Sequence, residues 1–185
     1  MGTLKLTGGS LRSRRVSAPS GRAVRPTPAR VKEALFSILG STVTDARVLD
    51  LYAGSGALGF EALSRGAAHV TFVEAHRRTA GMLARSAAEL GVAERCRVVA
   101  APAERAAARL HERYDLVFAD PPYALPYPRR TFEALRAAGA IDAGTVIVYE
   151  HSAQVSAPQN DGFELLRSAR YGAVALAFLN AAPVV

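Results

Sequence analysis

Apolar residues recur along this chain with two periods, one typical of strands and one typical of helices. From residue 47 onward, short apolar runs alternate with segments in which apolar residues recur every three or four positions. The pattern predicts strands at 47–52, 69–74, 95–100, 114–119 and 144–149, with a final pair at 163–168 and 173–179. It predicts helices at 56–65, 77–90, 102–110 and 129–138.

The order of these elements indicates the fold class. Alternating strands and helices predict a doubly wound α/β fold with a mostly parallel, Rossmann-like sheet. The run Leu-Val-Phe at 116–118 is apolar at every position, as strands are when helices cover both faces of a sheet. Cys96 is expected to begin a buried strand. One helix precedes the alternation, with Thr27 as its cap, Pro28 at its first position and Gly40 at its end.

The first residues of the chain follow a different pattern. Leu4 and Leu6 alternate with polar residues ahead of a glycine-rich turn at 8–10, which predicts a small β-hairpin. We therefore divide the chain into an N-terminal extension, residues 1–25, and a main domain, residues 26–185.

Positive charge is concentrated at the start of the chain. The 185 residues carry a net charge of +7, but residues 1–32 hold eight bases and no acid, while the rest holds 15 bases and 16 acids. Such a segment commonly binds nucleic acid, and a solvated tail is the alternative reading. The arginines that we expect to contact RNA are Arg12, Arg14, Arg15, Arg25 and Arg30.

Composition excludes several other classes of protein. Half of the residues are apolar, which is typical of a globular domain. The apolar runs are too short for a membrane helix and the first residues lack the core of a secretory signal, so we expect a cytoplasmic protein. A single cysteine excludes an intrachain disulfide. We predict no metal site, because no ligand spacing links the histidines His69, His76, His111 and His151.

A glycine-rich loop follows the first strand of the alternation. Gly54, Gly56 and Gly59 form a G-x-G-x-x-G pattern between a strand and a helix, and Glu74 follows 20 residues after Gly54. Such a loop approaches a nucleoside cofactor closely, and a carboxylate at the second strand suits its ribose. Dinucleotides and S-adenosylmethionine both fit. Asp50 favours the latter, because a carboxylate repels a pyrophosphate and attracts a sulfonium and an amino group. The expected cofactor-binding residues here are Asp50, Tyr52, Ala53, Gly54, Ser55, Gly56 and Glu74.

A second motif, Asp120-Pro121-Pro122-Tyr123, follows the fourth strand. The two prolines present their carbonyl groups on a rigid turn. Asp120 and the Pro121 carbonyl could accept the two N–H bonds of an exocyclic amine, which would localise the nitrogen lone pair and stabilise developing positive charge. Tyr123 could stack on a base that has left its helix. We therefore predict catalytic roles for these four residues.

The chain resembles the RsmD family of class I S-adenosylmethionine-dependent methyltransferases. The similar segments are 6–15, 25–39, 48–66, 71–74 and 120–123, and they extend over most of the chain. The resemblance implies a seven-stranded methyltransferase sheet with an antiparallel last strand and an N-terminal extension that helps to hold RNA. It implies methylation of the exocyclic N2 amine of a guanine in small-subunit (16S) ribosomal RNA. It also implies that Thr27 and Arg30 face the cleft.

One stretch departs from the family pattern. Relatives often place Asp or Asn after the third strand to bind the adenine of the cofactor, whereas this chain has Ala-Ala-Pro-Ala-Glu at 100–104. Ala103 or Glu104 is then the candidate for that contact.

Three alternatives remain open on the sequence. The tetrapeptide is shared with adenine amino-methyltransferases of DNA or RNA. The glycine loop alone also fits a nicotinamide-dependent oxidoreductase, and the basic segment fits an RNA-binding module without enzyme activity. For the leading hypothesis, the expected partner is ribosomal RNA within the small subunit or an assembly intermediate, bound by a monomer.

Overall fold

Seven strands form the main sheet of the protein. The computed structural model describes residues 2–18, 28–122, 125–156 and 162–181. The strands of the main sheet are β3 (Arg47–Leu51), β4 (His69–Glu74), β5 (Cys96–Ala100), β6 (Leu116–Ala119), β7 (Val146–Ser152), β8 (Phe163–Tyr171) and β9 (Val174–Ala181). The helices are α1 (Ala29–Leu39), α2 (Ala57–Ser64), α3 (Arg77–Glu89), α4 (Ala103–Ala107) and α5 (Arg129–Ala137), with single 3-10 turns at Gly40–Val43 and Ala93–Arg95.

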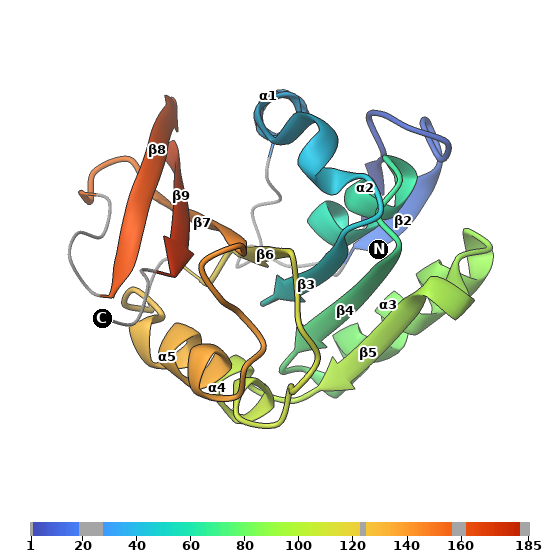
Figure 1. Cartoon of the computed structure of the whole chain (residues 1–185). Coiled ribbons are helices and arrows are strands. Elements are labelled where there is room, and N and C mark those ends of the chain that lie inside the picture. Colours follow the sequence, from blue (N-terminus) through green and yellow to red (C-terminus); the bar gives the residue numbers. More distant parts are fainter. Residues whose placement is uncertain (1, 19–27, 123–124, 157–161, 182–185) are drawn as a thin grey trace.

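The strand order is β5-β4-β3-β6-β7-β9-β8 (Figure 1). β4 and β5 extend the sheet on one side of β3, and β6 returns to pair with the other side. Strands β3 to β7 are parallel, whereas β9 runs antiparallel to both β7 and β8. The prediction of a doubly wound, mostly parallel sheet is confirmed. The change of direction between β3 and β6 is a switch point, where sheets of this kind bind ligands.

Helices cover both faces of the sheet (Figure 1). Val48 packs with apolar side chains of α1, α2 and α3, whereas its neighbour Leu49 packs with those of α4 and α5. Neither side chain is exposed. This two-sided burial explains why the central strands are apolar at consecutive positions. Within the described ranges, none of the helices is long and apolar enough to cross a membrane.

The first residues form a two-stranded antiparallel hairpin, as predicted. Its strands are β1 (Gly2–Lys5) and β2 (Arg15–Ala18). Leu6 and Val16 are completely buried and belong to the same apolar cluster as the side chains of α1, α2 and α3. The hairpin therefore shares its hydrophobic core with the main sheet.

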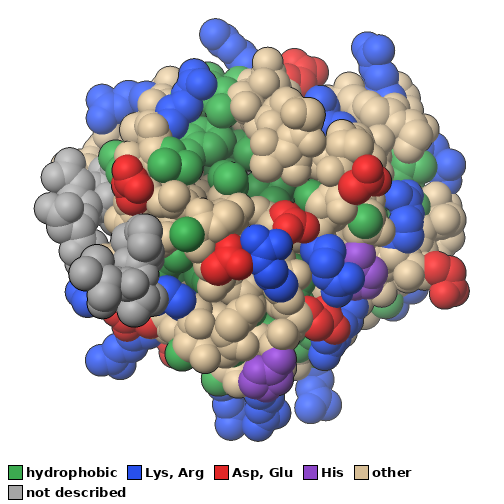
Figure 2. All heavy atoms as spheres, viewed as in Figure 1, with side chains coloured by type: hydrophobic (Ala, Val, Ile, Leu, Met, Phe, Trp, Pro, Cys, Tyr) green, Lys and Arg blue, Asp and Glu red, His purple; other side chains and the backbone are tan. Residues whose placement is uncertain are grey.

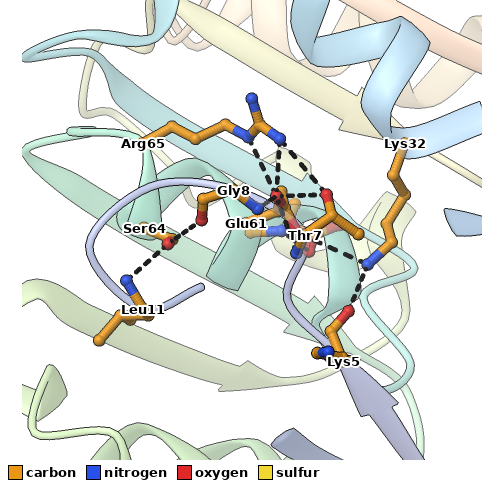
Figure 3. Close-up of polar contacts among 10 residues, drawn as sticks. Lys5, Thr7, Gly8, Leu11, Lys32, Glu61, Ser64 and Arg65 are labelled. Atoms are coloured by element: carbon orange, nitrogen blue, oxygen red, sulfur yellow. Dashed lines mark hydrogen bonds and ion pairs between the residues drawn. The ribbon is translucent and has the colours of Figure 1, made fainter. Parts of the chain in front are cut away.

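A buried carboxylate joins the hairpin to α2 (Figure 3). The Glu61 side chain has no exposed surface, and its oxygens accept hydrogen bonds from the backbone N–H groups of Thr7 and Gly8 at 2.8–3.2 Å and from the Thr7 hydroxyl at 2.8 Å. Arg65 Nε donates to it at 3.0 Å, and Lys32 Nζ lies 3.5 Å away. Burial raises the pKa of Glu61, but the bonds from Thr7 and the charge of Lys32 outweigh burial and lower it. Glu61 is thus held ionised inside the protein.

Lys32, one of the bases of the N-terminal basic segment, is buried. It counts among the eight bases of residues 1–32, yet its side chain is buried and donates to the Lys5 carbonyl oxygen as well as facing Glu61. Lys32 is therefore internal to the fold and unavailable to an external polyanion. The turn of the hairpin also lies very close to α2: a side chain on Gly9, whose φ is 72°, would collide with the carbonyl of Ser64.

Two local predictions were wrong. β5 is the edge strand of the sheet and Cys96 is only half-buried, so Cys96 does not begin a buried strand. Burial raises the pKa of its thiol to about 11, which leaves the thiol protonated at neutral pH. Pro28 occupies the N-cap position of α1, so the helix begins one residue later than predicted. Thr27, the expected cap, lies outside the described residues.

Replacement of Glu61 by alanine tests the anchoring of the hairpin. The substitution leaves Lys32 buried without its carboxylate and removes the acceptor of two backbone N–H groups. Breaking a buried pair in this way costs about 3–5 kcal/mol. We expect a loss of this size in the free energy of unfolding measured with urea. Glu33→Ala, on the exposed side of α1, is the control. Equal stabilities for the two variants would contradict the anchoring role.

Candidate active site

Acidic side chains gather at the carboxyl edge of the sheet, on one of its faces. Asp50 pairs with Phe72 of β4 and with Phe118 of β6. Because side chains alternate between faces, Glu74, two residues further along β4 than Phe72, lies on the same face as Asp50. Asp120 is the first residue after β6, and the charge of Asp50 contributes to its raised pKa. The parallel register thus places three acids from distant parts of the sequence beside the switch point.

The glycine loop turns sharply between β3 and α2. Tyr52, Gly54 and Gly56 all have positive φ angles, of 58°, 54° and 75°. A side chain on Gly56 would collide with Leu83 and Phe60, and its left-handed backbone favours glycine independently. Ala53 and Ser55 are buried within the loop, and the Ala53 N–H donates to the carbonyl of β4 residue Val73 at 3.0 Å. The loop is therefore fastened to the sheet on its inner side.

Gly59 allows α2 to approach the first acid. A side chain there would collide with Phe72 and would lie 2.9 Å from Asp50 Oδ2. The Gly59 N–H donates to that oxygen at 3.0 Å. Burial raises the pKa of Asp50 to about 8; the bond from Gly59 lowers it and the charge of Glu74 raises it. A buried carboxylate with a raised pKa is stabilised in its charged form by a cation, such as a sulfonium or an amino group.

Glu74 holds the loop from the neighbouring strand. Its Oε2 accepts a hydrogen bond from the Gly54 N–H at 2.9 Å and its Oε1 accepts one from the His76 N–H at 2.8 Å. These bonds fix the direction of the carboxylate, and each oxygen keeps a further lone pair for ligand hydroxyl groups. The acidic pair and the glycine loop therefore fit the cationic and ribose parts of S-adenosylmethionine.

The second motif forms a turn directly after β6. Asp120 is half-buried, Pro121 is buried and Pro122 is exposed. The Pro122 carbonyl accepts a hydrogen bond from the Leu125 N–H at 2.8 Å, which closes the turn. This bond leaves the Pro121 carbonyl as the candidate second acceptor beside Asp120. Tyr123 lies outside the described residues.

The carboxyl of Asp120 has a strongly altered environment. Burial raises its pKa well above the ordinary value, and the charges of Glu150 and Asp50 raise it further. Burial also raises the pKa of the Tyr149 hydroxyl, and the charges of Tyr52 and Asp120 raise it further. Charged groups of the glycine loop, the turn after β6 and the end of β7 therefore influence one another.

A cavity of about 200 Å³ lies between the turn after β6 and the end of β7. Its walls are formed mainly by proline and aromatic side chains, among them Pro121, Pro122, Tyr127 and Tyr149. Tyr127 and Tyr149 meet edge to face, with ring centroids 5.2 Å apart. Both tyrosines pack with apolar side chains of α4 and α5, and the cavity contacts the second motif at Pro121 and Pro122.

Comparison with known proteins identifies the family. A family model described as Conserved hypothetical protein 95 matches residues 4–180. "Ribosomal RNA small subunit methyltransferase D" of Escherichia coli K12 is 37% identical over 151 residues, which are 82% of this chain and 75% of that protein. "Putative rRNA methyltransferase YlbH" of Bacillus subtilis is 32% identical over 178 residues, 94% of this chain and 97% of that protein. The chain belongs to the RsmD family.

A solved structure agrees with this membership. "Putative methyltransferase yhhF from Escherichia coli" superposes with a TM-score of 0.84 at 34% identity and covers 98% of this chain and 99% of that one. As an RsmD-family protein, the chain is a class I methyltransferase. Neither a nicotinamide-dependent oxidoreductase nor a binding module without activity describes it.

The other predicted residues lie at varied places on this RsmD-family fold. Ala103 is buried at the start of α4, after the edge strand β5. Arg12, Arg15 and Arg30 are exposed. Arg14 is also exposed, but its guanidinium donates to the Glu89 carbonyl oxygen at the end of α3, at 2.7 Å. Arg25 lies outside the described residues. Figure 2 shows Lys and Arg side chains around most of the outline of one face.

The sequence reasoning missed Glu150 on β7. This carboxylate is only 4% exposed and is the second-largest cause of the raised pKa of Asp120. A signal was present, because a glutamate that directly follows the apolar run Val-Ile-Val-Tyr is an acid inside a core strand. Only the pairing of β6 with β7 shows that it lies beside Asp120.

The raised pKa of Asp50 predicts a pH-dependent cost of folding. Between the ordinary pKa of 3.8 and the folded value of about 8, the unfolded chain releases a proton that the folded protein retains. The stability of the ligand-free protein therefore falls as pH rises through this range. We expect Asp50→Asn, which keeps an acceptor for Gly59, to gain at least ~4 °C in Tm relative to the unmodified protein between pH 5 and pH 8.

The exposed acid Asp45 supplies the control for this experiment. Asp45→Asn should leave the pH dependence of the Tm unchanged, because an exposed carboxylate loses little hydration on folding. A constant Tm difference between Asp50→Asn and the unmodified protein at all pH values would show that ionisation of Asp50 does not lower the stability of the folded protein.

Proposed function

We propose that this protein methylates the exocyclic N2 amine of a guanine in small-subunit (16S) ribosomal RNA, with S-adenosylmethionine as methyl donor. The observation that supports the proposal is the parallel pairing of β3 with β6, in which Asp50 pairs with Phe118 and Asp120 follows two residues later, directly after β6. A cation-binding acid and an amine-binding acid are then neighbours. The names of the relatives support ribosomal RNA as the substrate.

The cofactor site in this proposal follows the glycine loop. When bound, S-adenosylmethionine supplies a methyl group activated by a sulfonium. Asp50 attracts its positively charged methionine part, and Glu74 binds the ribose hydroxyls with the lone pairs left by its backbone bonds. The backbone N–H of Ala103 would contact the adenine. The loop and cleft residues assigned to the site are Tyr52, Ala53, Gly54, Ser55, Gly56, Ala103 and Thr27.

The target amine is held by the turn after β6. Asp120 and the Pro121 carbonyl accept its two N–H bonds, which directs the nitrogen lone pair away from the purine ring. Because burial and neighbouring acids raise the pKa of Asp120, its carboxylate readily takes the proton that the nitrogen loses. Pro122 keeps the turn rigid, and Tyr123 stacks on the base. Most of the rate enhancement comes from this positioning.

The N-terminal extension, residues 1–25, is assigned to RNA binding, with Arg12, Arg14, Arg15 and Arg25 as contacts, and Arg30 of α1 is a further expected contact. The docked hairpin gives its arginines a fixed place relative to the catalytic edge, because Leu6, Val16 and Glu61 anchor it. The main domain, residues 26–185, is assigned to methyl transfer. The chain acts as a monomer in the cytoplasm, on ribosomal RNA in the small subunit or its assembly intermediate.

A labelled-methyl assay on small subunits from cells that lack this protein tests the proposal. Digestion of the product to nucleosides and mass spectrometry should show one N2-methylguanosine. Label on adenine, or label only on another nucleic acid, would refute the substrate assignment.

Asp120→Ala separates target binding from cofactor binding. Loss of an acceptor that acts in the transition state lowers kcat by about 10²–10³-fold. The Kd for S-adenosylmethionine, measured by calorimetry, should change by less than about threefold, because Asp120 belongs to the target side. Glu94→Ala, at an exposed position, is the control. Equal losses of both properties would contradict the assigned role.

The arginines of the hairpin are tested by salt. Each phosphate contact that is lost reduces the slope of log Kd against log salt by about one unit. We expect the double variant Arg12→Ala, Arg15→Ala to lose about two units of slope in RNA binding while keeping its affinity for S-adenosylmethionine. Arg109→Ala, on the side of the sheet covered by α4, is the matched control. An unchanged slope would exclude the hairpin from the RNA interface.

A further inference from the structure

Glu150 lies close to the turn that carries Asp120. Tyr149 of β7 pairs with Ala119, the last residue of β6, and Glu150 and Asp120 each directly follow this pair. The acid on β7 is therefore a neighbour of the acid that holds the target amine, and its charge contributes to the raised pKa of Asp120.

The cavity between Pro121 and the end of β7 offers hydrogen-bond acceptors. Glu150 and His151 both line it, and both are only 4% exposed. His151 Nδ1 lies 3.0 Å from the Ser152 carbonyl oxygen, so Nδ1 carries the hydrogen. Burial lowers the pKa of His151, which favours the neutral ring. Its Nε2 is then an acceptor that is buried and has no partner among the described residues.

Purines with an exocyclic amine differ in the atom beside that amine. In guanine, the N2 amine is next to N1–H, which is a donor. In adenine, the N6 amine is next to N1, which is an acceptor. A carboxylate beside Asp120 can accept the N1–H of guanine, but it repels the N1 lone pair of adenine.

We propose that Glu150 selects guanine by accepting its N1–H, while Asp120 holds the adjacent N2 amine. The proposal rests on the methyl transfer proposed above and concerns only how the base is chosen. It gives a reason why a motif shared with adenine methyltransferases serves guanine here: the neighbouring strand supplies a second acid. Two acceptors on one edge of the base also fix its orientation.

Replacing the target guanine by 2-aminopurine tests this directly. 2-Aminopurine keeps the 2-amine but has no hydrogen on N1. Small-subunit RNA with either base at the mapped target position would be assembled into subunits and methylated by the unmodified enzyme and by Glu150→Gln. Loss of one specific base contact costs about 10–150-fold. We expect the unmodified enzyme to prefer guanine by at least ~10-fold in kcat/KM.

The glutamine variant should change the preference itself. Its amide can donate to N1 of 2-aminopurine or accept from N1–H of guanine, so we expect the guanine preference to fall by about tenfold or more. Glu164→Gln, on the exposed side of β8, should leave the preference unchanged. Affinity for S-adenosylmethionine and the Tm verify that each variant is folded. A residue with a purely structural role would lower both activities together.

The outcomes are distinct. Equal activity of the unmodified enzyme on the two bases would overturn the role of Glu150 even if the variant failed to fold. An equal loss, or no loss, on both bases in Glu150→Gln would overturn it as well. Absence of methyl transfer to any guanine of the subunit would instead refute the proposed function.

Discussion

Parallel register is the constraint on which the site depends. Neighbouring parallel strands end at the same edge of the sheet. Residues that pair across them point to the same face. Asp50, Glu74, Asp120 and Glu150 are far apart in sequence, yet the register brings them together. Burial and the neighbouring negative charges raise the pKa values of Asp50 and Asp120 and so oppose the ionisation of these two groups. Such an edge gains stability when positive charge or N–H donors enter it.

Much of the fold follows from sequence patterns. The strands and helices after residue 46 were predicted within a few residues, because two-sided burial leaves apolar runs and glycines end the helices. The glycine loop was also recognisable, since Gly56 and Gly59 occupy places where a side chain would collide. The position of Cys96 was not, because a short apolar run does not reveal whether its strand is central or at an edge.

Contacts between distant segments were beyond the sequence. The residues around Lys32 in the sequence do not distinguish it from a solvent-exposed base. Only the docking of the hairpin on α2 shows that it is buried against Glu61. Glu150 likewise becomes significant only when β7 pairs with β6. Local patterns encode which face of an element is apolar. They do not encode which charged residue of another element will meet it.

The docking of the hairpin also orders events during synthesis. Thr7, Gly8, Ser10 and Leu11 leave the ribosome well before Glu61 and Ser64, to which they bind. Until α2 has been made, Leu6 and Val16 have no core to enter. The basic hairpin therefore takes its final position only after the glycine loop and α2 have been synthesised.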